Sequence, residues 1–266
     1  MVGLLIGLLG WAAGGLLNFL AERLPTRHSL RRAPACLYCD APRPPWQWLT
    51  LLAYLGGRGR CRRCGAHPPL RYAAVEAACV VLFVLLWWRH GLSWPLAYQA
   101  VFNWLLLLLV VTDLEHRLIP NAAVLPGLAL AALVSFFRLE RSAGWFWMGA
   151  VFAFVFIYSI YLLGGLFAHL VNRRRGGALQ EVVFGAGDVK LAVFIGLAVG
   201  FPEVVFALLI GIFLGGLAAL GYLVYQLAVT RRYTPFAAMP YGPFLALGAW
   251  AMLWFGPQIL RWYIGS

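Results

Sequence analysis

Charged side chains are scarce in this chain of 266 residues. Only 11% of the residues are Asp, Glu, Lys or Arg, whereas 63% are hydrophobic. An ordinary soluble domain carries about 25% charged residues and about 45–50% apolar ones. The composition therefore excludes an ordinary soluble enzyme. The apolar residues also gather in blocks that reach the roughly 20 residues needed to cross a bilayer.

Other features are missing as well. The first apolar block has no basic segment before it and no small-residue cleavage site after it, so we expect a retained helix and not a removed signal peptide. The sequence shows no internal repeat and no cofactor fingerprint. The arginines stand among prolines and cysteines without an aromatic stripe between them, so nucleic acid is not expected as a partner.

The apolar blocks predict an all-α, polytopic membrane protein with about eight transmembrane helices. Prolines mark several of the boundaries, because proline interrupts helices. The expected spans are 2–20, 73–89, 95–113, 121–137, 145–170, 188–200, 203–228 and 241–262. The only large soluble insertion covers residues 21–72. We therefore expect three parts: a first transmembrane helix at 1–20, a cysteine-rich domain at 21–72 and a larger transmembrane domain at 73–266.

The basic residues predict the orientation of these spans. One side of the membrane receives 17 of the 21 Lys and Arg residues. Basic loops are retained in the cytoplasm, so this side is expected to be cytoplasmic and both termini to lie outside. The net charge of +12 is then mainly a topology signal, with some attraction to anionic lipid.

Three acidic residues touch the apolar spans, near their cytoplasmic ends. Asp113 ends the third span, Asp188 opens the sixth, and Glu76 lies in the second. Aspartic proteolysis requires at least two carboxylates that can lie close together, here at one membrane depth. One carboxylate activates a water molecule and the other keeps a proton. Simpler interpretations are a helix cap for Asp188 and an interfacial position for Asp113.

Glycine and lysine surround the second of these aspartates. Gly185 and Gly187 permit close approach of backbone, which a helix cap does not require but an extended substrate would use. Lys190 lies two residues beyond Asp188 and is expected to extend to the cytoplasmic interface.

Two C-x-x-C pairs in the insertion predict a metal site. The pairs are separated by 21 residues, close to the spacing of a four-cysteine zinc ribbon. The expected ligands of a structural zinc are Cys36, Cys39, Cys61 and Cys64. Two disulfides are the alternative, but a cytoplasmic location disfavours them. His28 and His67 are possible substitute ligands, and Cys79 is expected to be a small core residue.

A family resemblance follows from these motifs. The segment GAGDVK, residues 185–190, resembles the Gly-x-Gly-Asp-x-Lys signature of bacterial type IV prepilin peptidases, a branch of the intramembrane aspartyl proteases. DLEHRLIPN resembles the family's first catalytic segment. GGLLNFLAERLP, RGRCRRCGAHPPLRYAAVE and MPYGPFLALGA resemble its amino-terminal segment, cytoplasmic loop and last span, in the same order. The resemblance implies that Asp113 and Asp188 are the catalytic pair and that 73–266 is the protease domain. The sequence departs from the family at WQWLTLLAYL and at Asn121.

The resemblance also implies a reaction and its partners. The expected activity is removal of the basic leader from type IV prepilins or type II secretion pseudopilins, at the cytoplasmic face of the bacterial inner membrane. N-methylation of the new amino terminus, with S-adenosylmethionine as donor, is implied as a second activity. Glu76 matches a family position, with helix positioning and substrate contact as equal alternatives. A Gly-x-Gly-Asp protease with another substrate and a metal- or proton-coupled transporter are the competing hypotheses.

The predicted orientation is testable at Thr26, just beyond the first span. In intact cells, a Thr26→Cys variant should react no more than the unmodified protein with a membrane-impermeant thiol reagent, because the insertion is expected in the cytoplasm. A Ser93→Cys variant, between the second and third spans, is the matched control and should react. Labelling at position 26 from outside, measured by the mass added to the protein, would reverse the topology.

Overall fold

The structure is a computed structural model that describes residues 1–26, 30, 33–56, 59–175, 185–230 and 240–264. This part of the chain is almost entirely helical, as predicted, and contains no strand. A single antiparallel bridge joins Ala35 and Pro42. The chain divides into two compact units, Met1–Leu108 and Leu109–Ser266, and α4 runs through the division.

The first unit consists of two long helices and the insertion between them. Its elements are α1 (Val2–Thr26), the 3-10 turn η1 (Pro45–Gln47), α2 (Thr50–Leu55), α3 (Leu70–His90) and the first part of α4 (Trp94–His116). Helix α1 packs along α3 through small residues. A Cβ atom at Gly14 would lie only 2.6 Å from the Cα of Glu76. Trp104 of α4 donates a hydrogen bond to the carbonyl of Ala13 at 2.9 Å.

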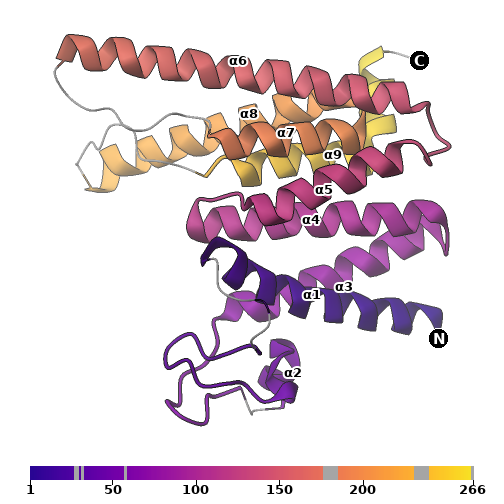
Figure 1. The fold of residues 1–266 in the computed structure, drawn as a ribbon, viewed down its shortest axis with the longest axis vertical. Helices are drawn as coiled ribbons and strands as arrows, with labels where there is room; N and C mark the ends of the chain where they lie inside the picture. Colours follow the sequence, from indigo (N-terminus) through magenta and orange to yellow (C-terminus); the bar gives the residue numbers. More distant parts are fainter. Residues whose placement is uncertain (27–29, 31–32, 57–58, 176–184, 231–239, 265–266) are drawn as a thin grey trace. The chain divides into compact units, whose positions relative to one another are not determined.

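The second unit surrounds one short helix with longer ones (Figure 1). Its elements are the end of α4, α5 (Asn121–Ser135), α6 (Ala143–Arg175), α7 (Ala186–Val199), α8 (Glu203–Tyr225), the π-helical turn η2 (Gln226–Thr230) and α9 (Gly242–Ile264). Helix α7 contacts α5, α6, α8 and α9. Nine of its 14 residues are buried, so α7 forms the core of this unit.

Glycines allow the helices of this unit to approach closely. A Cβ atom at Gly149 of α6 would lie 2.6 Å from the carbonyl oxygen of Gly196 in α7. A Cβ atom at Gly211 of α8 would lie 2.9 Å from the Cα of Leu245 in α9. Association of helices in a bilayer depends on such packing, since lipid tails are as apolar as the side chains.

Two arginines hold the far end of α7. Arg138, from the segment between α5 and α6, donates to the carbonyl of Ala198 at 2.6 Å and lies over the ring of Phe146. Arg141 forms an ion pair with Glu203 at 2.8 Å. These contacts satisfy carbonyl and carboxylate groups where α7 turns into α8, at the end of α7 opposite Asp188.

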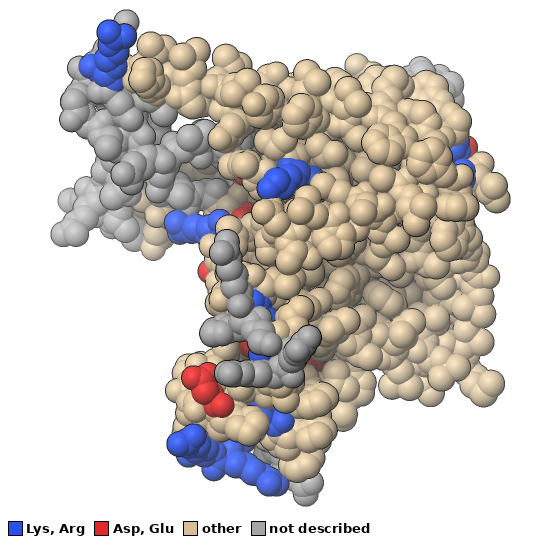
Figure 2. Space-filling view, viewed as in Figure 1, with Lys and Arg blue, Asp and Glu red and all other residues tan. Residues whose placement is uncertain are grey.

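Each of the eight expected spans coincides with a helix. Six helices within the described residues are long and apolar enough to cross a membrane, while α5 and α7 have 15 and 14 residues. Much of the helix surface is apolar and exposed, for example at Leu163, Phe213 and Leu220. Figure 2 shows a broad surface without charged side chains, as expected for helices that face lipid.

The glycine contact between α6 and α7 can be tested by a single methyl group. Gly196→Ala places its Cβ atom against the carbonyl group of Gly149 and should destabilise the protein by about 1–3 kcal/mol, as overpacking usually does. The matched control is Gly165→Ala in α6, where nothing lies within 4 Å of the added atom. Thermal unfolding in detergent should show a lower Tm for Gly196→Ala alone, and equal Tm values would contradict the packing argument.

Candidate functional site

The two cysteine pairs form turns of the same construction. In the first turn, the N–H of Cys36 donates to the carbonyl of Ala41, and the N–H of Asp40 donates to the carbonyl of Cys36. In the second turn, the N–H of Cys61 donates to the carbonyl of Ala66, and the N–H of Gly65 donates to the carbonyl of Cys61. Asp40 and Gly65 occupy equivalent positions and both have positive φ angles, 53° and 72°. Each turn therefore points its two thiols to the same side.

The four thiols converge on one point, as the spacing predicted. All four sulfur atoms lie within 4.8 Å of one another. The Sγ atoms of Cys36 and Cys64 are 3.7 Å apart, and so are those of Cys39 and Cys61. Ligands at about 2.3 Å from a tetrahedral zinc ion lie about 3.8 Å from each other. The described cysteines are free thiols, and their separation fits a zinc ion and not two disulfides.

The turns also favour the thiolate form that a metal requires. Backbone N–H groups of Cys64 and Arg63 lower the pKa of the Cys61 thiol to about 6. At Cys39 the N–H of Ala41 acts in the same direction, but burial and the three neighbouring thiols raise the pKa of that thiol to about 12. The thiolate of Cys61 therefore forms readily, whereas burial and the neighbouring thiols oppose deprotonation of Cys39. A divalent cation relieves this repulsion and displaces the remaining protons.

Asp113 lies in the last turns of α4, in the second unit, and is 5% exposed. Its Oδ2 accepts a hydrogen bond from the N–H of Gly242 at 2.9 Å. A Cβ atom at position 242 would lie 2.6 Å from the same oxygen, so any larger residue there would force the carboxylate of Asp113 to shift. The beginning of α9 is therefore fitted to the carboxylate of Asp113.

Asp188 lies in the first turn of α7. Its Oδ2 accepts from the N–H of Gly185 at 2.8 Å, so the carboxylate does cap the beginning of the helix. The same carboxylate is close enough to Asp113 to be repelled by it, and close enough to Tyr241 to interact electrostatically. Capping and proximity to the second aspartate thus occur together.

The loop after α4 and the beginning of α7 are fitted to each other. A Cβ atom at Gly187 would lie 3.0 Å from the Cβ of Ile119, so this glycine accommodates the loop that follows Asp113. Lys190 does not extend alone to the interface, because its Nζ donates to Oδ1 of Asn121 at 2.7 Å. Both contacts draw the two aspartate-bearing segments together.

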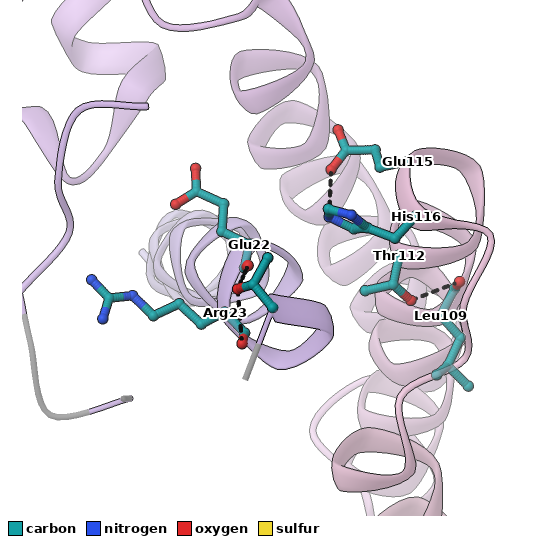
Figure 3. Close-up of polar contacts among 7 residues, drawn as sticks. Glu22, Arg23, Leu109, Thr112, Glu115 and His116 are labelled. Carbon is teal, nitrogen blue, oxygen red and sulfur yellow. Dashed lines mark hydrogen bonds and ion pairs between the residues drawn. The ribbon is translucent and has the colours of Figure 1, made fainter. Parts of the chain in front are cut away.

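The end of α4 carries further polar groups (Figure 3). The carboxylate of Glu115 faces the ring of His116 at 3.9 Å, and the hydroxyl of Thr112 donates to the carbonyl of Leu109 at 3.1 Å. In the first unit, the carbonyl of Glu22 accepts from the hydroxyl of Thr26 at the end of α1, at 2.8 Å. Glu115, two residues after Asp113 in the sequence, thus pairs with its neighbour His116.

Comparison with known proteins identifies the family. A family model described as "Type IV leader peptidase family" matches residues 100–220, and one described as "Bacterial Peptidase A24 N-terminal domain" matches residues 8–90. A relative named "Prepilin leader peptidase/N-methyltransferase" from Pseudomonas aeruginosa is 30% identical, over 97% of this chain and 91% of its own length. The chain belongs to the type IV leader peptidase family. The predicted resemblance and the prediction of a peptidase are therefore confirmed.

Other leader peptidases are similar over comparable lengths. Proteins of the same name are 30% identical in Legionella pneumophila, over 98% of this chain and 94% of the relative, and 33% identical in Pseudomonas putida, over 85% and 73%. No solved structure matches the chain significantly.

The two family matches include the predicted site residues. Asp113 and Asp188 both lie in the segment matched to leader peptidases, and the four cysteines and Glu76 lie in the matched amino-terminal domain. Tyr241 and Gly242, which meet the aspartates, were not predicted as site residues. Their motif, MPYGP, was the available signal. His28, a possible substitute ligand, lies outside the described residues.

Metal content tests the cysteine cluster directly. The purified protein should contain one zinc ion per chain, measured by elemental mass spectrometry. Changing Cys36 and Cys39 together to Ser should release the ion, because two thiolates of a closed tetrahedral site are lost. Cys79→Ser is the matched control and should retain the metal, since Cys79 lies apart from the cluster. Zinc retained in the double variant, or never present, would refute the metal site.

Proposed function

We propose that this protein removes the basic leader of a type IV prepilin or type II secretion pseudopilin by aspartic proteolysis. The observation that carries the proposal is that Asp113 lies near enough to Asp188 to interact with it electrostatically, and that both lie within the segment matched to leader peptidases. In aspartic proteolysis two neighbouring carboxylates share one proton, so that one member is ionised while the other is protonated.

The hydrogen bonds suggest how the pair is held for this reaction. Gly242 N–H fixes Oδ2 of Asp113, and Gly185 N–H fixes Oδ2 of Asp188. Each carboxylate is thus oriented through one oxygen, and the second can serve water or the scissile carbonyl. The ionised member activates the water and the protonated member polarises the peptide bond.

The setting supports a substrate that is itself partly in the membrane. Both aspartates lie at the ends of apolar helices, next to polar loop residues. We propose that these ends face the cytoplasm of the bacterial inner membrane and that both termini lie outside, in keeping with the basic loops. A leader followed by an apolar helix would present its scissile bond at this depth.

Methyl transfer is the second proposed activity, and it rests on the names of the relatives. The donor implied is S-adenosylmethionine, which supplies the methyl group for the newly exposed amine. We assign the domain at 21–72 to this activity and the domain at 73–266 to proteolysis. The proposed zinc is structural, because four thiolates fill its coordination shell. Family membership leaves the transporter hypothesis without support.

Replacement of the aspartates tests the peptidase mechanism. Asp113→Asn and Asp188→Asn should each lower cleavage of a prepilin by at least about a thousandfold, because an amide can neither activate water nor donate the proton. The matched control is Glu115→Gln, an exposed acid two residues from Asp113, which should cleave normally. Cleavage is read by mass spectrometry of the product after confirming membrane insertion, and near-normal turnover in either aspartate variant would remove the pair from the mechanism.

The cysteine double variant tests how the two activities divide. With Cys36 and Cys39 changed to Ser, the insertion should loosen while the second unit, which holds both aspartates, keeps its own packing. We expect cleavage to persist within about tenfold of normal and methylation of the product to fail. Loss of cleavage as complete as in Asp188→Asn would instead make the metal domain part of the peptidase.

A further inference from the structure

Glu76 is a fully buried carboxylate in α3, with 0% of the residue exposed. Burying a charge in an apolar setting is costly unless hydrogen bonds replace its water. Within the described residues, its hydrogen-bond partners are three N–H groups. Oε1 accepts from the backbone of Thr50 at 2.6 Å, and Oε2 accepts from the backbone of Leu51 at 2.9 Å and from the indole of Trp11 at 2.8 Å.

These donors belong to segments far apart in the sequence. Trp11 is in the middle of α1, and Thr50 and Leu51 begin α2. Helix α2 lies between the two cysteine pairs, in the cysteine module, which we define as residues 33–56 and 59–69. One carboxylate of α3 therefore joins the module to both long helices of the first unit.

The module cannot supply this acceptor itself. The first N–H groups of any α-helix have no partner within the helix. The residue at the N-cap of α2 is Leu49, whose side chain makes no capping hydrogen bond and packs against Gly15 of α1 instead. Glu76 thus provides from α3 the acceptors that a Ser or Asp at position 49 would otherwise provide.

We propose that Glu76 is a positioning residue that docks the cysteine module on α1 and α3, and so aligns the module for methyl transfer. This inference rests on the proposed second activity. Glu76 is not needed to form the metal site, because the two cysteine turns close through their own backbone hydrogen bonds. It is not needed for the aspartate pair either, because both aspartates belong to the other unit.

Other contacts of the first unit should keep the module attached when Glu76 is changed. Asn18 of α1 donates to the carbonyl of Tyr72 at 3.0 Å, and Arg23 donates to the carbonyl of Ala33 at 2.9 Å. A Glu76→Gln variant should therefore fold with the module present but less precisely held. The Gln side chain offers one oxygen for three donors, and its NH₂ group faces an N–H.

Four measurements on the full-length protein in nanodiscs test the proposal. In Glu76→Gln, the backbone amides of Thr50 and Leu51 should exchange with deuterium at least about tenfold faster. Zinc should remain at the amount found in the unmodified protein, and prepilin cleavage should stay within about threefold. The ratio of methylated to cleaved product should fall at least about tenfold, which general destabilisation would not produce without a parallel loss of cleavage.

Two further variants separate docking from other roles. Trp11→Phe removes one donor and leaves both α2 contacts, so the two amides should stay protected and methylation should stay within about threefold. Glu76→Asp keeps the charge but shortens the side chain, and it should give intermediate exchange and intermediate methylation. It serves as the test if Glu76→Gln does not insert into the membrane.

Each contrary result has a distinct meaning. Unchanged exchange in Glu76→Gln, or normal methylation despite faster exchange, overturns the docking role. Loss of zinc would show that Glu76 supports the metal site, and cleavage as low as in Asp188→Asn would place it in the peptidase reaction. If the unmodified protein neither cleaves nor methylates prepilin, the proposed function fails, while exchange and zinc content still decide whether Glu76 docks the module.

Discussion

Backbone contact through glycine is the constraint on which the second unit depends. In water, burial of apolar surface would hold α6, α7, α8 and α9 together, but lipid offers no such gain and packing must replace it. Gly149 and Gly196 bring α6 and α7 into contact, and Gly211 does the same for α8 and α9. The position of α7 follows from these contacts, and with it the position of Asp188.

The aspartate pair is in turn completed by segments that the sequence separates widely. Gly242 meets Asp113 across 129 residues, and Gly187 receives Ile119 from the loop after α4. The Asn at position 121, a departure from the family pattern, still accepts a hydrogen bond from Lys190. Asn121 thus accepts a hydrogen bond from Lys190, but as a neutral residue it does not compensate the charge of the lysine.

Sequence reasoning succeeded where the physical signal is local. Apolar runs predicted eight helices that the structure contains, α1 and α3–α9, but not the short α2 in the insertion. The spacing of the C-x-x-C pairs predicted the cluster of four thiols. It failed where a contact depends on tertiary structure. The motif MPYGP marked Tyr241 and Gly242 as part of a resemblance, but the motif alone does not reveal that its glycine lies against the carboxylate of Asp113. The segment after residue 170 was expected as a loop, yet α6 continues to Arg175, because arginine is a good helix former outside the membrane. The sequence indicated that Glu76 lies in an apolar span, but not that it accepts hydrogen bonds from the beginning of α2. The N-cap residue of α2 is Leu49, which has no capping side chain, so the sequence carries no helix-start signal there.

The small size of α7 has a consequence for how the protein is made. Fourteen residues extend about 21 Å, less than the roughly 30 Å of a hydrocarbon core. The helix tolerates this in the finished protein because other helices, and not lipid, surround it. As it leaves the ribosome, α7 has α5 and α6 available but neither α8 nor α9, and it is too short to be retained in the bilayer on its own. Its stable insertion must await α8, which follows after the turn at Gly200 and is long enough to span. We therefore expect the two helices to enter as a hairpin, and the segment that bears Asp188 to reach its place late in biosynthesis.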